Sequence, residues 1–281
     1  MKKWFIAVWA FTVLTAFVNS ANAAAFDPSI WDGLLKRHVV VLRGGEASRV
    51  DYAGMAADRS KLQTFLREAS SISQMEFDTW SRNAQLAFLI NVYNAWTVEL
   101  ILTKYPDLES IKDLGGWFQT PWQKAFIPLL GETRSLDDIE HGLIRGSGRY
   151  DDPRVHFAVN CASVGCPALR AEAYTPGRLD AQLDDQARKF LSDRSRNRVY
   201  GNAIEISPIF KWYREDFEKG WHGWNSLSEF LEQYRSSLGM TPAQEKALRH
   251  GDMSIGFMDY DWSLNDTHGK SNGRLSLEEK R

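Results

Sequence analysis

Apolar side chains occur on every side of one segment, residues 82–104, which makes it the most hydrophobic stretch of comparable length outside the N-terminus. Ser81 precedes it as a helix N-cap, and Pro106 follows it, so the sequence predicts one long helix between these two positions. A helix that is apolar around its whole circumference is buried on all sides. We therefore expect this helix to form the centre of the fold.

Other segments carry apolar residues on one side only, at the spacing typical of amphipathic helices, and several of them begin with a capping residue or a proline. These helices are predicted at residues 28–37, 58–69, 135–146, 176–191, 208–217, 227–238 and 242–250. Short apolar runs bounded by glycine, proline or asparagine predict strands at residues 125–129, 133–135, 154–159, 199–200, 203–206 and 254–262. Helices outweigh strands, so the fold class predicted is α+β: a single mostly helical domain with a small antiparallel sheet around the buried central helix.

The first residues have the pattern of a secretory signal peptide. Lys2 and Lys3 precede an apolar run over residues 4–18, and a small-residue cleavage site ends at Ala23. The run is shorter than the roughly 20 residues that span a bilayer, which disfavours the alternative of a retained anchor. We therefore expect residues 1–23 to be removed, the protein to be periplasmic or secreted, and no stable membrane insertion after cleavage.

The remaining chain has no linker, repeat or low-complexity run before its end. The sequence thus predicts one globular domain over residues 24–264. Residues 265–281 contain too few apolar side chains to pack against it, and they are predicted to form a flexible C-terminal tail.

Composition limits the function. The chain has 34 Lys and Arg against 36 Asp and Glu, a formal charge of −2 that becomes −4 once Lys2 and Lys3 are removed. A protein that binds nucleic acid needs a clustered excess of positive charge, so no nucleic-acid partner is expected. A small-molecule or peptide ligand fits the composition, and no cofactor or metal is predicted.

The two cysteines, Cys161 and Cys166, lie in a loop of small residues that follows the predicted strand at 154–159. Such a loop is a common place for a nucleophile, and its backbone amides at 162–165 are candidates for an oxyanion hole. His141, from a separate predicted helix, is the expected proton acceptor for Cys161. In a continued strand His156 would point away from Cys161, because alternate side chains lie on opposite faces.

An oxidising compartment provides an alternative interpretation, in which Cys161 and Cys166 form a disulfide and Cys161 is no nucleophile. A Cys-x4-Cys pair with scattered histidines does not match the usual ligand spacing of a zinc site.

Further polar residues could shape such a site, either by binding substrate or by holding its parts in place. Buried amides need hydrogen-bond partners, so Asn91 and Asn94 of the central helix either tie loops to the helix or contact a ligand. Aromatic residues at 212–213, 221 and 224 are expected to pack in the core and at its rim rather than to form a stacking platform. The site-shaping candidates are Asn91, Asn94, Glu140, His156, Asn160 and Ser163.

Five runs, taken together, resemble the family called domain of unknown function 547. They are AFLINVYNAW at 87–96, LDDIEHGLIR at 136–145, HFAVNCAS at 156–163, ISPIF at 206–210 and DYDWSLN at 259–265. The resemblance implies that these segments form one domain and line one cleft, and it assigns no activity. A buried helix followed by predicted strands that carry histidine is also loosely similar to the papain and transglutaminase type of cysteine hydrolase. In those enzymes the nucleophilic cysteine lies at the start of the central helix, whereas the central helix here has no cysteine, so the order of the residues differs.

These observations lead to two hypotheses about function. The first is a periplasmic cysteine-dependent hydrolase or acyl-transfer enzyme that acts through Cys161 and His141. The alternative is a non-enzymatic ligand-binding or envelope-interaction domain with a Cys161–Cys166 disulfide.

Overall fold

A computed structural model describes residues 26–116 and 118–268. About 52% of it is helical and 12% is in strands of small sheets, which confirms the predicted α+β class. The α-helices are α1 (Ser29–His38), α2 (Tyr52–Ala57), α3 (Arg59–Ser71), α4 (Gln74–Asp78), α5 (Arg82–Leu102), α6 (Leu179–Ser192), α7 (Ile209–Trp212), α8 (Leu227–Gln233), α9 (Arg235–Leu238) and α10 (Pro242–His250).

Short turns of tighter or wider helix connect these elements. The 3-10 helices are η1 (Arg43–Gly45), η2 (Ile111–Leu114), η3 (Pro121–Gln123), η5 (Pro153–Phe157), η6 (Arg214–Phe217) and η7 (Trp221–Gly223), and η4 (Asp138–Arg145) is a π-helix. The strands are β1 (Val39–Leu42), β2 (Ala47–Val50), β3 (Ile127–Leu129), β4 (Glu132–Arg134), β5 (Arg198–Tyr200), β6 (Ala203–Ile206) and β7 (Ser254–Phe257).

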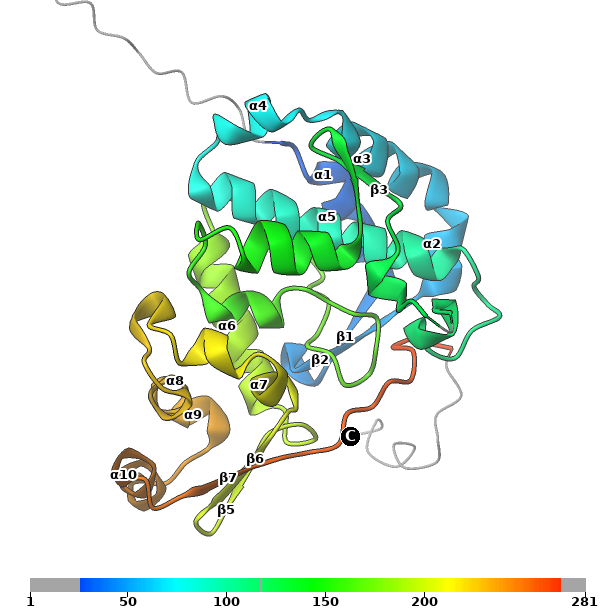
Figure 1. Cartoon of the computed structure of the whole chain (residues 1–281). Coiled ribbons are helices and arrows are strands. Elements are labelled where there is room, and N and C mark those ends of the chain that lie inside the picture. Colours follow the sequence, from blue (N-terminus) through cyan, green and yellow to red (C-terminus); the bar gives the residue numbers. More distant parts are fainter. Residues whose placement is uncertain (1–25, 117, 269–281) are drawn as a thin grey trace, which may run out of the picture.

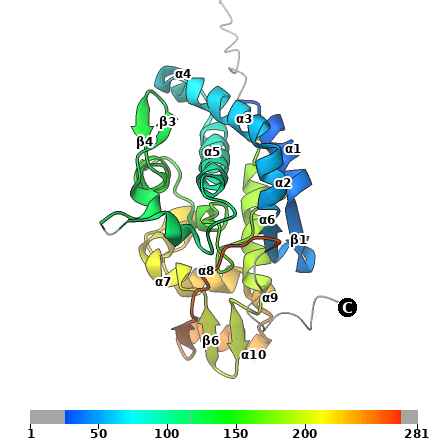
Figure 2. The same cartoon turned by 90° about the vertical axis from the view of Figure 1, so that its right-hand side faces the viewer.

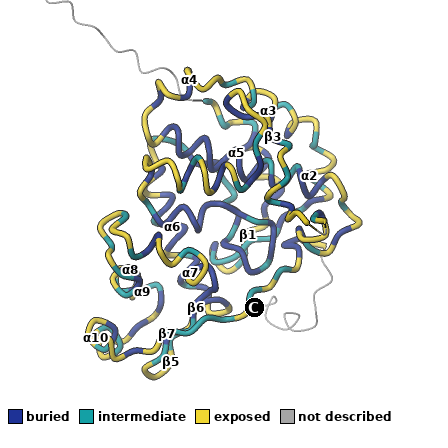
Figure 3. The backbone as a smooth tube through the Cα atoms, viewed as in Figure 1, coloured by how far each residue is buried: buried dark blue, intermediate teal, exposed yellow. Residues whose placement is uncertain are grey.

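Helix α5 is the central helix that the sequence predicts. The Ser81 hydroxyl caps it by accepting a hydrogen bond from the Ala84 amide. Helices α1 to α3 pack on one side of α5 and the β3–β4 hairpin lies on the other (Figure 2). By length and composition α5 could cross a membrane, but 94% of its most apolar window is buried inside the protein (Figure 3). Its hydrophobicity is therefore that of a core helix.

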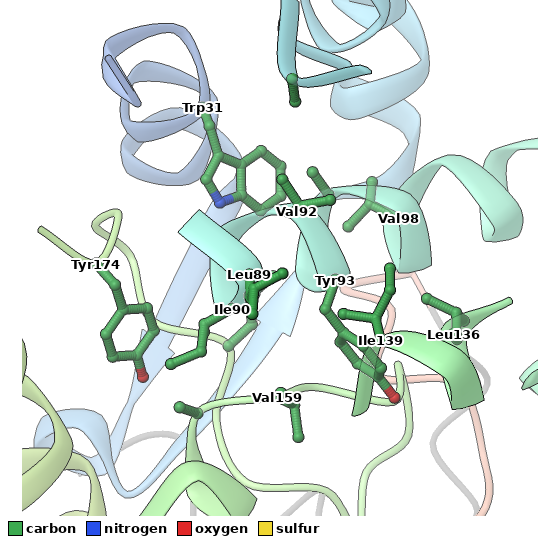
Figure 4. Close-up of a cluster of buried hydrophobic side chains, with 14 of the residues drawn as sticks. Trp31, Leu89, Ile90, Val92, Tyr93, Val98, Leu136, Ile139, Val159 and Tyr174 are labelled. Atoms are coloured by element: carbon green, nitrogen blue, oxygen red, sulfur yellow. The ribbon is translucent and has the colours of Figure 1, made fainter. Parts of the chain in front are cut away.

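The core has two parts. The larger one surrounds α5, and Figure 4 shows Leu89, Ile90 and Val92 of α5 among side chains from other segments, including Trp31 of α1 and Ile139 of η4. The second is rich in phenylalanine and lies between α6, α7, η6 and α8. There the ring centres of Phe157 and Phe190 are 5.0 Å apart. The Phe157 ring also contacts the rings of Phe210, Phe217 and Phe230.

The largest sheet lies beside the second part of the core, away from α5 (Figure 1). Strands β5 and β6 form the predicted antiparallel hairpin, and β7 then pairs with β6 in parallel. Two antiparallel hairpins complete the strands of the described residues: β3–β4, which the sequence predicts, and β1–β2, which it does not.

The strand predicted at 154–159 is wrong. Pro153 begins the 3-10 helix η5, and the Asp152 side chain accepts a hydrogen bond from the Arg154 amide at its first turn. A short apolar run does not distinguish a buried strand from a buried helical turn. The run is apolar because η5 is enclosed by the core, with Val155 and Phe157 fully buried.

The two ends of the predicted domain compare differently with the structure. Residues 1–23, the predicted signal peptide, lie outside the described residues. The prediction that residues 265 and 266 belong to a flexible tail is wrong, because Asn265 and Asp266 are buried. Asn265 accepts a hydrogen bond from the Tyr52 hydroxyl, and Asp266 forms a parallel bridge with Val50. The ordered domain therefore includes these two residues.

Candidate functional site

A cavity of about 210 Å³ lies where the two parts of the core meet, and Cys161 is in its wall. We call it the thiol cavity. Its lining comes from α5, η3, η4, η5, the loop after η5, α7 and the segment after β7. The lining residues are Tyr93, Thr120, Trp122, Asp137, Glu140, His141, His156, Val159, Cys161, Cys166, Pro167, Ile209, Trp212, Tyr213, Tyr260 and Trp262.

Two buried amides, Asn94 and Asn160, hold the loop that carries Cys161, and a third, Asn91, holds a segment that follows it. Asn94 of α5 accepts a hydrogen bond from the Asn160 amide and donates one to the Ala158 carbonyl. Asn160 in turn accepts from the Ala162 amide and donates to the Pro167 carbonyl. Asn91 makes the same kind of pair with the amide and carbonyl of Tyr174. Of the two roles considered for Asn91 and Asn94, the structure therefore favours tying loops to the helix.

The loop turns sharply directly after the cysteine. Ala162 has φ of 59°, in the left-handed region that residues with a Cβ rarely adopt. The Asn160 side chain holds this conformation through its bond to the Ala162 amide, 2.9 Å long. The turn exposes one side of Cys161 to the cavity, while its neighbour Ala162 is buried.

The Cys161 sulfur lies among hydrogen-bonding groups. Its Sγ is 3.0 Å from the Tyr260 hydroxyl and 3.1 Å from the Ser163 hydroxyl, and these two hydroxyls are 3.0 Å apart. Hydrogen bonding by Cys166, and then by Ser163 and Tyr260, lowers the pKa of Cys161 to about 7, against the opposing effect of burial. About half of the Cys161 side chains are therefore thiolates at neutral pH.

Tyr260 and Cys166 stay protonated beside this thiolate. Burial, followed by the negative charge of Cys161, raises the pKa of Tyr260 well above its usual value. Burial also raises the pKa of Cys166. Both side chains are therefore donors when Cys161 is ionised, which is the state that a nucleophilic thiol requires.

The predicted oxyanion hole is wrong. Within residues 162–165 the backbone amides already have partners: Ala162 donates to Asn160, Val164 to Ser263, and Gly165 to Asp261. The Ser163 amide hydrogen-bonds the Cys161 sulfur. Sequence reasoning missed this because the acceptors Ser263 and Asp261 lie about a hundred positions later in the chain.

Cys161 and Cys166 lie close together in space, and both are free thiols in this structure. The Cys161 amide donates to the Cys166 sulfur at 3.0 Å. Cys166 is buried and sits within 3.9 Å of the Val159 carbonyl. The predicted disulfide is thus absent here, and its formation in an oxidising compartment stays a prediction.

His141 lines the thiol cavity, as expected of a residue that acts on Cys161, but its ring nitrogens face other groups. Arg145 donates to Nδ1 at 2.8 Å, and Nε2 is 3.8 Å from an Asp137 carboxylate oxygen. Because Nδ1 accepts, neutral His141 carries its proton on Nε2. Among the described residues no hydrogen bond joins His141 to Cys161.

His156 also lines the thiol cavity, and its surroundings are those of a proton acceptor. Nε2 donates to the Asp216 carboxylate at 2.7 Å, so in the neutral ring Nδ1 carries a lone pair. Nδ1 is buried and has no hydrogen-bond partner among the described residues. Burial lowers the pKa of His156, which favours the neutral ring at pH 7. The expectation that His156 points away from Cys161 rested on a strand that does not form.

Asp216 is fully buried and has three hydrogen-bonding neighbours, which hold its pKa well below the usual range despite burial. Besides His156, they are Arg145 at 2.5 Å and Lys219 at 2.7 Å. Arg145 also contacts His141, so it links the two histidines through Asp216. The π-helix η4 supplies both His141 and Arg145, and such widened turns are frequent at functional sites.

Glu140 is buried in the cavity wall and holds phenol rings in place. It accepts a hydrogen bond from the Tyr93 hydroxyl at 3.0 Å and another from Tyr213. Burial and the charge of Glu140 raise the pKa of Tyr213, which therefore remains a donor. The Tyr213 ring stacks on His156 with centres 3.9 Å apart. Glu140 thus positions His156 through Tyr213.

Sequence reasoning did not single out Tyr260, Asp216, Trp122 or Trp262, and it considered Trp212 and Tyr213 only as core or rim residues. The run at 259–265 was a signal for Tyr260, because that run is one of the five motifs. Trp212 was expected in the core or its rim, but it is 47% exposed and lines the cavity. Trp221 and Trp224 are not among the cavity-lining residues.

A search of the described residues for a metal site gave no cluster of three or more histidine, cysteine, aspartate or glutamate side chains.

Comparison with known proteins identifies one region of the chain. No curated protein matches the sequence, and no solved structure matches the fold. These comparisons do not show the looser similarity to papain and transglutaminase. A family model described as "Protein of unknown function, DUF547" matches residues 77–191, which include α5, η4, η5 and the Cys161 loop. Residues 77–191 are thus similar to the DUF547 family, as the motifs indicate.

Proposed function

We propose that this protein is a cysteine-dependent hydrolase or acyl-transfer enzyme with Cys161 as its nucleophile. The observation that carries the proposal is the state of this thiol: it borders a cavity and its pKa is lowered to about 7. A structural cysteine in an apolar core has a raised pKa, as Cys166 does. The contrast between two cysteines five positions apart favours a chemical role for Cys161.

In this proposal His156 accepts the proton of the Cys161 thiol, and Asp216 holds the His156 ring in place. Asp216 fixes the His156 ring through Nε2 and leaves Nδ1 as the free acceptor in the wall of the thiol cavity. A histidine held by a carboxylate is one half of an acyl-transfer triad, and the proposal takes Cys161, which lines the same cavity, as its nucleophile. His141, the acceptor expected from the sequence, has Arg145 on Nδ1 and is assigned a substrate-binding role at the cavity mouth.

The chemistry proceeds in two balanced steps. The Cys161 thiolate adds to a carbonyl carbon, the bond to the leaving group breaks, and the leaving group departs with the proton that His156 had taken from the thiol. Water or another acceptor then attacks the thioester, and the released thiolate recovers a proton through His156. The neighbouring hydroxyls of Tyr260 and Ser163 stabilise the thiolate at both ends of this cycle.

We also propose a periplasmic or secreted location, which rests on the sequence of residues 1–23. Expression of the full chain in a bacterium, followed by fractionation and N-terminal sequencing, tests it. A mature terminus at Ala24 in the periplasmic fraction supports it, and an uncut chain in the cytoplasm contradicts it.

Acylation by p-nitrophenyl acetate tests the enzymatic proposal. The reduced protein should release p-nitrophenolate, and a mass spectrum of its peptides should place one acetyl group on Cys161. Cys161→Ala should abolish both signals, and His156→Gln should slow turnover while His141→Gln has a smaller effect on it. Cys161→Ala with unchanged turnover would refute the proposal. An exposed-site control, Ser236→Ala, should behave as the wild type.

A binding domain stapled by a disulfide is the second candidate, favoured by the short distance from the Cys161 amide to the Cys166 sulfur. Peptide masses of protein isolated without reductant from the periplasm decide between the two. A complete Cys161–Cys166 disulfide supports the binding domain, and free thiols support the enzyme.

A further inference from the structure

Three tryptophans from distant parts of the chain meet at the thiol cavity. Trp122 comes from η3, Trp212 from α7, and Trp262 from the segment after β7. Trp212 and Trp262 stack with ring centres 5.8 Å apart, and Trp122 meets Trp262 edge to face at 5.9 Å. We call this group the tryptophan wall.

Within the wall, Trp212 is the ring that is open to solvent. Trp262 is half-buried between Trp212 and the Lys112 ammonium, which lies 3.7 Å from its ring centre. Tyr260 packs against both indoles, at 4.9 Å from Trp212 and 4.4 Å from Trp262. Trp262 and Tyr260 thus brace Trp212, which is 47% exposed.

A braced, exposed indole at the edge of a cavity has the properties of a ligand contact. Large apolar side chains are rarely left in water at a concave site unless something covers them. The indole also keeps its place without a ligand, because Trp262 and Tyr260 hold it. A ligand that stacks on Trp212 therefore meets a surface that is already formed.

The size of the cavity limits what enters it. Its volume of about 210 Å³ is below the roughly 300–1,000 Å³ of sites that enclose a whole drug-sized ligand. The cavity is too small to enclose a disaccharide, so a small acyl group can lie beside Cys161 while the rest of such a ligand extends outside against Trp212. A long lipid chain would need a longer apolar tunnel.

The polar groups around the wall indicate the chemistry of that outer part. Thr120, Asp137 and His141 line the same cavity and offer a hydroxyl, a carboxylate and an imidazole N–H. A sugar ring presents apolar C–H groups on its face and hydroxyls at its edge, so it matches an indole flanked by such groups. Lys112 above Trp262 disfavours a cationic sugar, such as one with a free amine.

We propose that the thiol cavity and the tryptophan wall bind an acylated, uncharged sugar, with its small acyl group beside Cys161 and its ring on Trp212. The proposal rests on the proposed function, because it takes the acyl group as the part that Cys161 attacks. It goes further in naming the substrate class: a sugar that carries an acetyl-sized group in ester or amide linkage.

Binding to the Cys161→Ala protein tests this without turnover. The probe is N,N′-diacetylchitobiose, and binding is followed by calorimetry and by tryptophan fluorescence. We expect saturable binding that Trp212→Ala weakens by roughly fivefold or more, as for loss of one stacking contact, and that Trp212→Phe weakens less. The deacetylated disaccharide should bind more weakly than the acetylated one.

Trp221→Ala is the matched control. Like Trp262, Trp221 is half-buried with a lysine over its ring, because the Lys219 ammonium lies 3.6 Å from its ring centre. Trp221 lies outside the thiol cavity. Its removal should leave affinity for the disaccharide unchanged. Circular dichroism of each variant verifies folding, and Trp212→Phe keeps the test valid if Trp212→Ala does not fold.

The inference is overturned if the disaccharide does not bind at millimolar concentration, if Trp212→Ala binds as tightly as the parent, or if N-acetylphenylalanine amide binds more tightly than the disaccharide. Acetylation of Cys161 by p-nitrophenyl acetate in the absence of sugar binding overturns the sugar inference and supports the proposed function. Sugar binding with an unreactive Cys161 supports the sugar site and overturns the proposed function.

Discussion

Replacing Tyr260 with phenylalanine removes one donor from the Cys161 sulfur and leaves the ring in place. The hydroxyl lies 3.0 Å from Sγ and, since burial raises the pKa of Tyr260, it donates to the thiolate. A hydrogen bond to a charged group contributes about 1.5–3 kcal/mol. At 1.36 kcal/mol per unit, we expect Tyr260→Phe to raise the pKa of Cys161 by about one to two units from its value near 7.

The rate of alkylation by iodoacetamide, measured from pH 5 to pH 10, reports this pKa. The midpoint of the profile should move up, because less of the thiol is ionised at any given pH. The plateau at high pH should also rise by about threefold per unit, because a more basic thiolate is a better nucleophile. The two profiles should therefore cross, a result that simple loss of structure would not produce.

Peptide mapping assigns the alkylated residue, so that Cys166 does not contribute to the measured rate. Tyr200→Phe is the matched control, since Tyr200 is 53% exposed on β5 and outside the cavity. Ser163→Ala should move the midpoint in the same direction as Tyr260→Phe. A midpoint for Tyr260→Phe within about half a unit of the wild type would refute the account of how the thiol is activated.

Three further predictions concern stability. Asp216→Asn should lower the free energy of unfolding at pH 7 by about 3 kcal/mol, because Arg145 and Lys219 lose their charge partner and His156 loses its carboxylate acceptor. Since the pKa of Asp216 is lowered by folding, its contribution is present above the ordinary aspartate pKa near 4 and is lost as the pH falls further, so urea titrations of variant and wild type should converge in acid. Leu89→Ala, at a fully buried position of α5, should cost about 2–5 kcal/mol in urea unfolding, whereas Val41→Ala, at a half-exposed position, should cost less than 1 kcal/mol. Ser81→Ala should cost about 1 kcal/mol by loss of the α5 N-cap, and an unchanged melting temperature would contradict that assignment.

The central helix was predictable because its signals are local and agree with one another. Ser81 offers an N-cap, the apolar residues extend for more than five turns, and Pro106 lies just beyond the end. The same holds for the β5–β6 hairpin, whose turn at Gly201 has the required positive φ. Local chemistry of this kind does not depend on which parts of the chain meet later.

The region around Cys161 shows what local signals leave out. The run at 154–159 is apolar because it is enclosed, and enclosure favours a strand and a helical turn equally. The error carried over into the interpretation of His156, whose direction was argued from strand alternation. In η5 that alternation does not apply, and His156 and Cys161 line one cavity.

Other features of the site depend on contacts between distant segments. Asp216 reaches His156 across 60 positions, and Tyr260 reaches Cys161 across 99. Nothing in the neighbourhood of either residue in the sequence indicates its partner. The tryptophan wall is of the same kind, because each indole alone reads as a core or rim residue.

The pairing of the Cys161 loop with the end of the domain also has a consequence for the timing of activity. The Val164 and Gly165 amides bond to Ser263 and Asp261, and Tyr260 arrives with the same segment. A ribosome makes these residues a hundred positions after the cysteine. Until they dock, Cys161 lacks the Tyr260 donor and has only the hydrogen bonds of Cys166 and Ser163 from its own loop. The thiol therefore reaches its full reactivity only after the last segment of the domain has been synthesised and has docked.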